Sequence, residues 1–121
     1  MEVPEQMARI RNITFDSADP PSLAPFWLAA TGYEVEYQNP HIAVLKDQAS
    51  VAPRILLIKV PEPRQGKNRV HVDLEAEDRE AEVERLVGLG ATRGETVDEW
   101  GIVWTVMHDP EGNVFCITGR H

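Results

Sequence analysis

The stretch Val70-His71-Val72-Asp73-Leu74-Glu75 decides the fold, because it alternates apolar and polar residues without a break. Side chains alternate between the two faces of a strand, so this pattern predicts a half-buried strand. Its valines and leucine face the interior, and His71, Asp73 and Glu75 share the opposite face. Any chemistry carried by this strand therefore lies on the side away from the core.

The residues that follow the strand predict a helix and then three more strands. The helical pattern covers residues 78–89, with Gly90 placed to end it. The strand-like runs cover residues 92–97, 102–108 and 113–118. The turn Asp109-Pro110-Glu111-Gly112 joins the last two runs, and its glycine stands where φ is expected to be positive. The second half of the chain is thus a strand, a helix and three strands.

The first half of the chain predicts the same order. A strand over residues 8–16 precedes a helix that ends at Thr31-Gly32, and Pro25 inside that helix leaves its start open. Three strand-like runs then cover residues 33–37, 41–46 and 54–60. A polar linker over residues 61–68 separates the halves. We therefore expect a single α+β domain over residues 1–121, built from two βαβββ modules at about residues 8–60 and 69–118.

Composition excludes several classes of partner. The chain has 12 Lys and Arg against 20 Asp and Glu, a formal net charge of −8, which argues against nucleic acid or an anionic membrane as a partner. No apolar run approaches the roughly 20 residues of a membrane span. The single cysteine, Cys116, has no internal disulfide partner, which suits a reducing cytoplasm. We therefore expect a cytoplasmic protein whose partner is a small organic ligand.

Three segments resemble the glyoxalase-like branch of the vicinal oxygen chelate superfamily that is common in actinobacteria. This superfamily includes glyoxalase I, extradiol dioxygenases and bleomycin-resistance proteins. The three segments are residues 26–33, residues 68–74 and residues 104–116. The resemblance covers nearly the whole chain and implies that each module curls a four-stranded mixed sheet, and that paired modules enclose a cavity. It also implies a homodimer, because modules often pair across a two-fold axis.

The resemblance also implies where a metal ion would bind. Metal-dependent members hold a divalent ion with one side chain from the first strand and one from the last strand of each module. These positions fall here at Asn12 and His71 on the first strands, and near Ile58 and at Cys116 on the last strands. The usual glutamates are missing from both last strands. We therefore expect no metal cofactor, and if a metal is bound, His71 would be its ligand.

Two side chains, His71 and Asp73, are the candidates for catalysis. They stand two residues apart on one face, so Asp73 would orient the imidazole or serve as a carboxylate ligand. The competing interpretation is a cavity histidine hydrogen-bonded to Asp73 or Asn12. Cys116 is expected to face the cavity, because its neighbours Phe115 and Ile117 should face the helices. Nothing cationic adjoins it in sequence, so we expect it to act as a small apolar residue and not as a reactive thiolate.

We expect the function to be small-molecule binding in a degenerate, metal-free cavity lined by Asn12, Ile58, His71, Asp73, Trp104 and Cys116. Trp104 would supply an aromatic wall for the ligand. The alternative is an enzyme of the superfamily that uses His71: a metal-dependent lyase, isomerase or dioxygenase, or a metal-free enzyme with His71 as base. Fold alone does not decide between these functions, so whether the protein is an enzyme stays open at this point.

Overall fold

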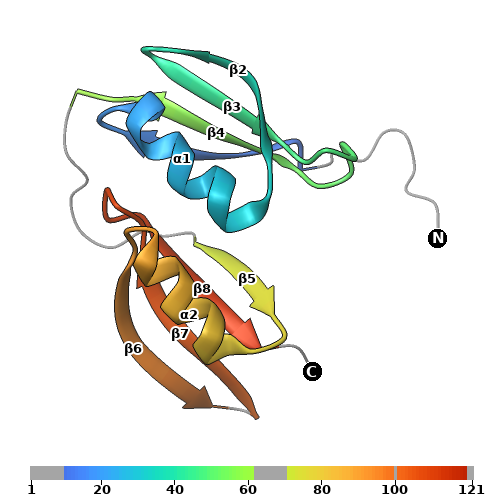
Figure 1. The fold of residues 1–121 in the computed structure, drawn as a ribbon, viewed down its shortest axis with the longest axis vertical. Coiled ribbons are helices and arrows are strands. Elements are labelled where there is room, and N and C mark those ends of the chain that lie inside the picture. The colour runs from blue at the N-terminus through green and yellow to red at the C-terminus, as the bar shows by residue number, and fades with distance from the viewer. Residues whose placement is uncertain (1–9, 62–70, 100, 120–121) are drawn as a thin grey trace.

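The computed structural model describes residues 10–61, 71–99 and 101–119, and each half of the chain contains the predicted elements (Figure 1). Module one contains β1 (Asn12–Ser17), α1 (Pro20–Thr31), β2 (Glu34–Asn39), β3 (Ile42–Lys46) and β4 (Arg54–Lys59). Module two contains β5 (Val72–Ala76), α2 (Arg79–Gly88), β6 (Thr92–Glu99), β7 (Ile102–His108) and β8 (Val114–Gly119). Most of the predicted linker, together with Val70, lies outside the described residues.

Each module forms one four-stranded mixed sheet, and neither sheet closes into a barrel. Sheet one has the strand order β1-β4-β3-β2, and sheet two has the order β5-β8-β7-β6. The first and last strands of each module pair in parallel, and the other pairs are antiparallel. Figure 1 shows α1 and α2 each lying across one face of its own sheet. The predicted α+β class and the two-module fold are confirmed.

The structure settles where α1 begins. Pro20 and Pro21 occupy its first turn. Backbone N–H groups in the first turn have no acceptor within the helix, so the N–H groups that proline lacks cost no hydrogen bond there. Pro25 lies inside the helix on an exposed position, so the carbonyl that it leaves unpaired faces water. Gly32 ends the helix at φ 78°, as its position in the sequence predicted. Of the helices in the described ranges, none is long and apolar enough to cross a membrane.

A cluster of aromatic side chains from both modules forms the centre of the core. Trp27 on α1 is fully buried, stacks on Phe15 of β1 with ring centroids 5.0 Å apart, and meets Phe26 edge-on at 5.3 Å. Phe115 of β8 contacts the same tryptophan at 5.1 Å. Aromatic pairs at these distances add stabilisation beyond the area that they bury. The two modules therefore share one hydrophobic core.

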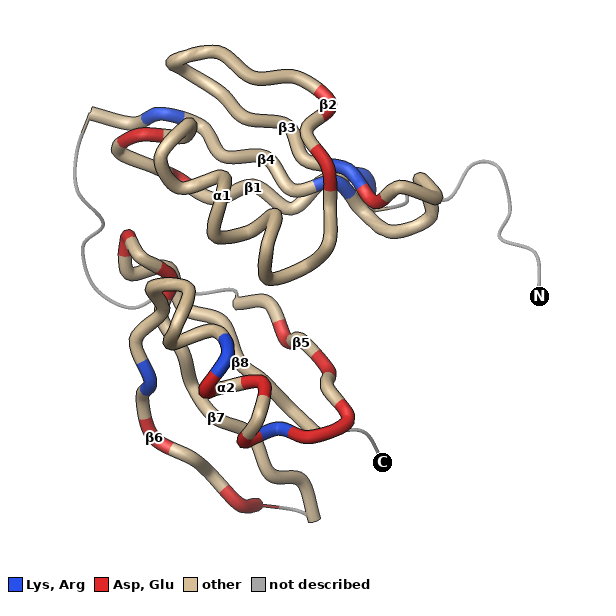
Figure 2. The backbone as a smooth tube through the Cα atoms, in the orientation of Figure 1, with Lys and Arg blue, Asp and Glu red and all other residues tan. Residues whose placement is uncertain are grey.

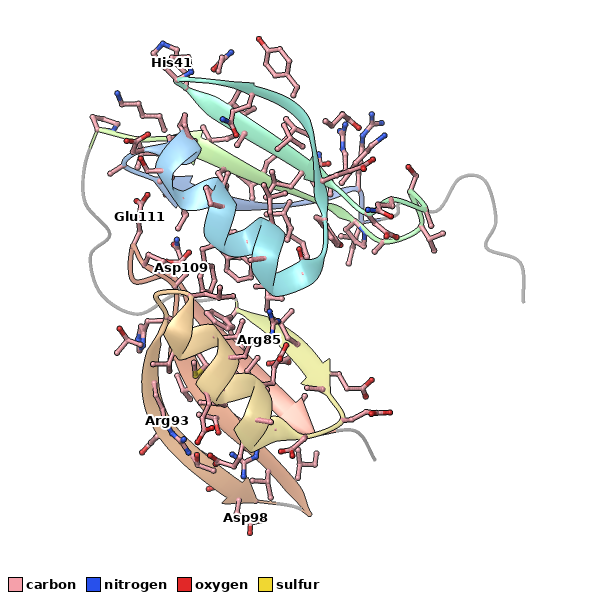
Figure 3. The ribbon with its side chains drawn as sticks, viewed as in Figure 1. His41, Arg85, Arg93, Asp98, Asp109 and Glu111 are labelled. Carbon is pink, nitrogen blue, oxygen red and sulfur yellow. The ribbon has the colours of Figure 1, made fainter. Side chains whose placement is uncertain are left out.

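The turn between β7 and β8, residues 109–113, binds module one through two carboxylates (Figure 3). The buried Asp109 accepts a hydrogen bond of 2.9 Å from Trp27 Nε1, and also bonds from Asn113 Nδ2 and two backbone amides of its own turn. Glu111 accepts bonds from Ser17 Oγ and from the amide of Ala18, just before α1. The turn thus supplies the acceptor for the buried indole N–H of Trp27, and it anchors the segment just before the N-terminal end of α1.

Arg85 of α2 binds the other end of α1. Its guanidinium donates to the carbonyls of Ala29 and Ala30 at 3.0 and 3.2 Å, and it is paired with Glu82. These carbonyls belong to the last turn of α1, where no helical N–H remains to bond them and a cation is favourable. Both ends of α1 are therefore bonded by residues of module two.

Glu80 links the first turn of α2 to β6. Its carboxylate accepts hydrogen bonds from Arg93 at 2.7 and 2.9 Å and from Arg79 at 2.7 Å. The bonds from Arg93, followed by those from Arg79, lower the pKa of Glu80 from 4.5 to about 2. Arg79 also donates to the fully buried Thr105 Oγ1 at 2.7 Å, so the cluster extends from the surface to the inner face of sheet two.

We expect Asp109→Ala to lower the free energy of unfolding by about 3 kcal/mol, because it leaves the buried Trp27 N–H and Asn113 amide without an acceptor. Denaturant titration followed by tryptophan fluorescence measures this loss. The matched control is Asp47→Ala, which removes an aspartate that accepts bonds only within its own exposed loop. Asp47→Ala should lower the free energy of unfolding much less than Asp109→Ala does. An equal loss of stability in both variants would contradict the assigned role of Asp109.

We expect the stabilisation from Glu80 to be present above pH 4.5 and to disappear as the pH falls towards about 2, because its folded-state pKa is the lower one. Acid titration of the midpoint of unfolding should therefore be steeper for the wild type than for Glu80→Gln. The control is Glu84→Gln, one helical turn further along α2. If the midpoint of unfolding fell with pH in parallel for the wild type and Glu80→Gln, Glu80 would make no pH-dependent contribution to stability.

Candidate functional site

A cavity of about 510 Å³ lies on the face of sheet two away from α2. Alternation along the strands sends Phe115, Ile117 and Met107 to the core, all fully buried, and turns Trp104 and Thr118 to the opposite face, which carries the cavity. The lining residues are His71, Asp73 and Glu75 along β5, Ile102 and Trp104 on β7, and Thr118 and Gly119 on β8. We call this cavity the sheet-two pocket. Its wall combines one aromatic ring, apolar groups and two carboxylates.

Three groups with acid, base or nucleophile chemistry converge beside this wall. His71, Asp73 and Cys116 each present a ligand-type atom, and these atoms lie within 4.8 Å of one another. The His71 Nε2 and Asp73 Oδ1 atoms are 3.3 Å apart, and the two side chains are 45% and 65% exposed. Asp73 and Cys116 are direct partners in the parallel pairing of β5 and β8. Strand pairing thus brings together residues that are 43 positions apart in the chain.

Cys116 is held as a neutral thiol. Burial raises its pKa, and the neighbouring Asp73 raises it further, because the thiol donates a hydrogen bond to that carboxylate and a thiolate would meet a like charge. The side chain is only 3% exposed. This environment does not activate a nucleophile at neutral pH, which agrees with the absence of any cation beside Cys116 in the sequence.

Module one places its predicted site residues elsewhere. The Asn12 side-chain oxygen accepts a hydrogen bond from Arg54 Nε at 3.0 Å, and Arg54 Nη1 contacts Glu36 at 2.7 Å. Ile58 lies at the opposite end of the same strand pair, where it faces Asp16. Neither Asn12 nor Ile58 lines the sheet-two pocket. The structure therefore brings His71, Asp73 and Trp104 together in the pocket lining. Cys116 lies beside His71 and Asp73 but is buried and is not among the lining residues, and the two module-one residues lie apart from all of them.

The strand register also changes the module-one counterpart of Cys116. With Asn12 aligned on His71, the pair Asp73–Cys116 corresponds to Thr14–Leu56, and Ile58 corresponds to Thr118. Leu56, like Ile58, has no atom that binds a metal ion. The equivalent position in module one is thus Leu56, two residues before the Ile58 that the resemblance indicated.

Four lining residues were missed as binding residues: Glu75, Ile102, Thr118 and Gly119. Glu75 was placed on the same strand face as His71 and Asp73, but without a role in binding. Alternation could have found three of them, because Glu75 lies two residues after Asp73, Ile102 two before Trp104, and Thr118 two after Cys116. The alternating pattern along each strand shows which side chains share a face. Only the pairing of the strands shows that these side chains form one wall of a cavity.

The four-ligand metal centre that the family resemblance implies does not fit this chain. It needs donors on the first and last strands of both modules, and module one offers an amide engaged by a guanidinium and a hydrocarbon side chain. Among the described residues, the grouped donors are the histidine, carboxylate and thiol of module two. A centre shared equally by the two modules is therefore not supported by the donor set.

Comparisons with known proteins agree with the fold. The profile of the glyoxalase-like domain matches residues 12–118. A glyoxalase/bleomycin resistance protein/dioxygenase family enzyme from Burkholderia phytofirmans superposes with a TM-score of 0.76 at 18% identity, covering 93% of this chain and 98% of that one. A lactoylglutathione lyase from Agrobacterium tumefaciens gives 0.69 at 17% identity, covering 95% and 96%.

A third solved structure of similar fold is a complex with a ligand. It is the bleomycin-binding protein of Streptomyces verticillus complexed with copper(II)-bleomycin, with a TM-score of 0.64 at 15% identity over 95% of this chain and 100% of that one. No curated protein matches the sequence. At identities this low the solved structures establish the fold, and the function has to be argued from the site.

Proposed function

The chain belongs to the glyoxalase-like domain family, within the vicinal oxygen chelate superfamily, and from this premise we propose that it binds a small organic cation in the sheet-two pocket. One observation carries the proposal: Trp104, Asp73 and Glu75 all line the same cavity of about 510 Å³. That volume lies in the range of about 300–1,000 Å³ that is usual for small-molecule sites. An aromatic wall beside carboxylates favours a ligand that is both planar and positively charged.

The charge of module two supports a cationic ligand. Figure 2 shows acidic residues along β5 and on its connection to α2, which are Asp73, Glu75, Glu77 and Asp78. The whole chain has a formal net charge of −8, so its field attracts cations and repels anions. The same field disfavours nucleic acid and anionic membranes as partners. A cytoplasmic location is consistent with a chain whose one cysteine is a free thiol.

We propose that this ligand binds without a resident metal cofactor. The support is the donor set of module one, where Asn12 is bonded to Arg54 and where Leu56 and Ile58 carry no donor atom. The bleomycin-binding protein of similar fold is an example of a small-molecule binder with this architecture. A binding role thus needs only the groups that line the pocket.

An enzyme remains the second candidate, and the contact of 3.3 Å between His71 Nε2 and Asp73 Oδ1 favours it. A carboxylate beside an imidazole fixes the orientation of the ring, as in many general-base arrangements. A substrate in the sheet-two pocket would lie within reach of His71, which lines it. Under this alternative, His71→Ala would abolish turnover and leave ligand affinity nearly unchanged.

We also propose a homodimer in which a second copy covers the open side of the sheet-two pocket. The described lining comes from a single sheet, and Ile102 at its rim is 42% exposed. An exposed apolar side chain beside a one-sided cavity favours burial against another surface.

We expect ethidium, a planar aromatic cation, to bind the wild type more tightly than phenanthridine, a neutral ring system of similar shape. Asp73→Asn and Trp104→Leu should each weaken ethidium binding about tenfold, by loss of a charge and of an aromatic face. Fluorescence titration measures the affinities, and Asp98→Asn controls for the change in net charge. Equal affinity for the neutral ring, or equal effects of Asp98→Asn and Asp73→Asn, would refute a cation-specific pocket.

We expect sedimentation velocity to show a dimer that Ile102→Glu shifts towards monomer, because the substitution places a charge in the interface. The matched control is Val87→Glu on α2, a residue 44% exposed on the opposite side of sheet two. A monomeric wild type, or equal dissociation in both variants, would overturn the proposed interface.

A further inference from the structure

Titratable and apolar residues separate across the wall of the sheet-two pocket. In sheet two, β8 lies between β5 and β7 (Figure 1). Among the described lining residues, the titratable ones are His71, Asp73 and Glu75, all on or next to β5. The large apolar ones are Ile102 and Trp104, both on β7. The pocket therefore has a β5 side that carries charge and a β7 side that is apolar, with a whole strand between them.

The strand register places one residue of each side in a single row across the sheet. Thr118 of β8 pairs with Glu75 of β5, and it also pairs with Trp104 of β7. Neighbouring strands are about 4.8 Å apart, so the backbone positions of Glu75 and Trp104 are separated by on the order of 10 Å. Side chains stand roughly perpendicular to a sheet, so this separation also holds approximately for the carboxylate and the indole. A ligand reaches both groups if its ring and its charge lie at separate ends.

The residues of β8 between the two sides leave room for such a ligand. Thr118 is short, and its hydroxyl donates to the carbonyl of Gly119 at 3.2 Å, so it does not extend across the pocket. In the neighbouring row, Asp73 pairs with Cys116, another short side chain, which is only 3% exposed. A narrow chain can therefore cross β8 without meeting a long side chain of that strand.

We propose that the ligand is an arylalkylammonium compound, in which a flexible chain separates an aromatic ring from a positive charge. The ring stacks on Trp104, the chain crosses β8 over Thr118, and the ammonium group lies beside the carboxylates of Glu75 and Asp73. This inference rests on the proposed function, because it takes the sheet-two pocket to be a site for an organic cation. It narrows that function to ligands with two ends. A planar cation whose charge lies within its ring system uses only part of the pocket.

A homologous series of naphthylalkyl trimethylammonium salts, from naphthylmethyl to naphthylbutyl, tests this geometry. Each salt is compared with a neutral analogue in which tert-butyl replaces trimethylammonium. The ratio of the two affinities, measured by fluorescence titration, gives the contribution of the charge at each chain length. This ratio should rise with chain length by roughly fivefold, because only the longer chains bring the charge to β5.

Glu75→Gln should abolish the rise in the affinity ratio, because it removes the charge at the far end of the row. The matched control is Glu84→Gln, which makes the same change at an exposed position of α2, on the other side of sheet two. It should leave the rise unchanged. Glu75 is exposed as well, so both variants are expected to keep the wild-type fold.

Trp104→Leu tests the other end of the ligand. It should weaken the salts and their neutral analogues by the same factor, roughly tenfold, because Trp104 contacts the ring and not the charge. A loss confined to the salts would mean that the charge itself lies over the indole, as in a cation–π contact, and would overturn the inference.

The same titrations distinguish a failure of this inference from a failure of the proposed function. If no salt binds more tightly than its neutral analogue, the pocket is not a cation site, and both are refuted. If the salts bind more tightly by one constant factor at every chain length, or if Glu75→Gln lowers that factor equally throughout the series, the cation site stands and the two-ended ligand is refuted.

Discussion

The indole of Trp27 is the group on which the rest of the structure depends. Its ring is fully buried between Phe15 of module one and Phe115 of module two, and its N–H is bonded to Asp109 on the β7–β8 turn. A buried N–H is costly without a partner, so the turn of module two has to lie against α1 of module one. Glu111 and Arg85 then bond the two ends of α1. The resulting interface fixes the inner faces of both sheets and leaves their outer faces free for chemistry.

The two modules have the same architecture but unequal chemistry. On module two, the outer face carries a histidine, two carboxylates and a tryptophan around one cavity, with the buried thiol of Cys116 beside Asp73. At the equivalent place on module one, Arg54 is held between Asn12 and Glu36, a self-satisfied network in which the guanidinium charge is already neutralised. An internally paired network of this kind stabilises a sheet face and has little left to offer a ligand. One module therefore supplies the candidate site, and the other supplies much of the core that supports it.

Membership of the glyoxalase-like domain family accounts for the fold but not for the activity, because the solved structures that share it include a lactoylglutathione lyase and a bleomycin-binding protein. The candidate site of this chain is built on the pairing of Asp73 with Cys116 across β5 and β8, beside His71. This arrangement raises the pKa of the thiol through burial and through the neighbouring carboxylate, and so disfavours nucleophilic chemistry.

Local pattern was sufficient for the elements and their faces. The alternation of residues 70–75 and the glycines at 32, 90 and 112 predicted strands, helix ends and a turn, because side-chain direction and positive φ are properties of a few adjacent residues. It also indicated that His71 and Asp73 share a face. It did not fix the module-one counterpart of Cys116, which the strand register places at Leu56, two residues before Ile58, because register is set by the pairing of distant strands.

The amino-acid sequence by itself thus determined the α+β class, the two modules and which side chains leave each strand on the outer side. Only the tertiary structure decided that β5 lies beside β8 in a register that opposes Asp73 to Cys116, and that Asn12 is bonded to Arg54 instead of lining the cavity. The physical reason is that strand pairing joins residues far apart in the chain, and its register follows from packing the whole core around Trp27, which no local pattern encodes.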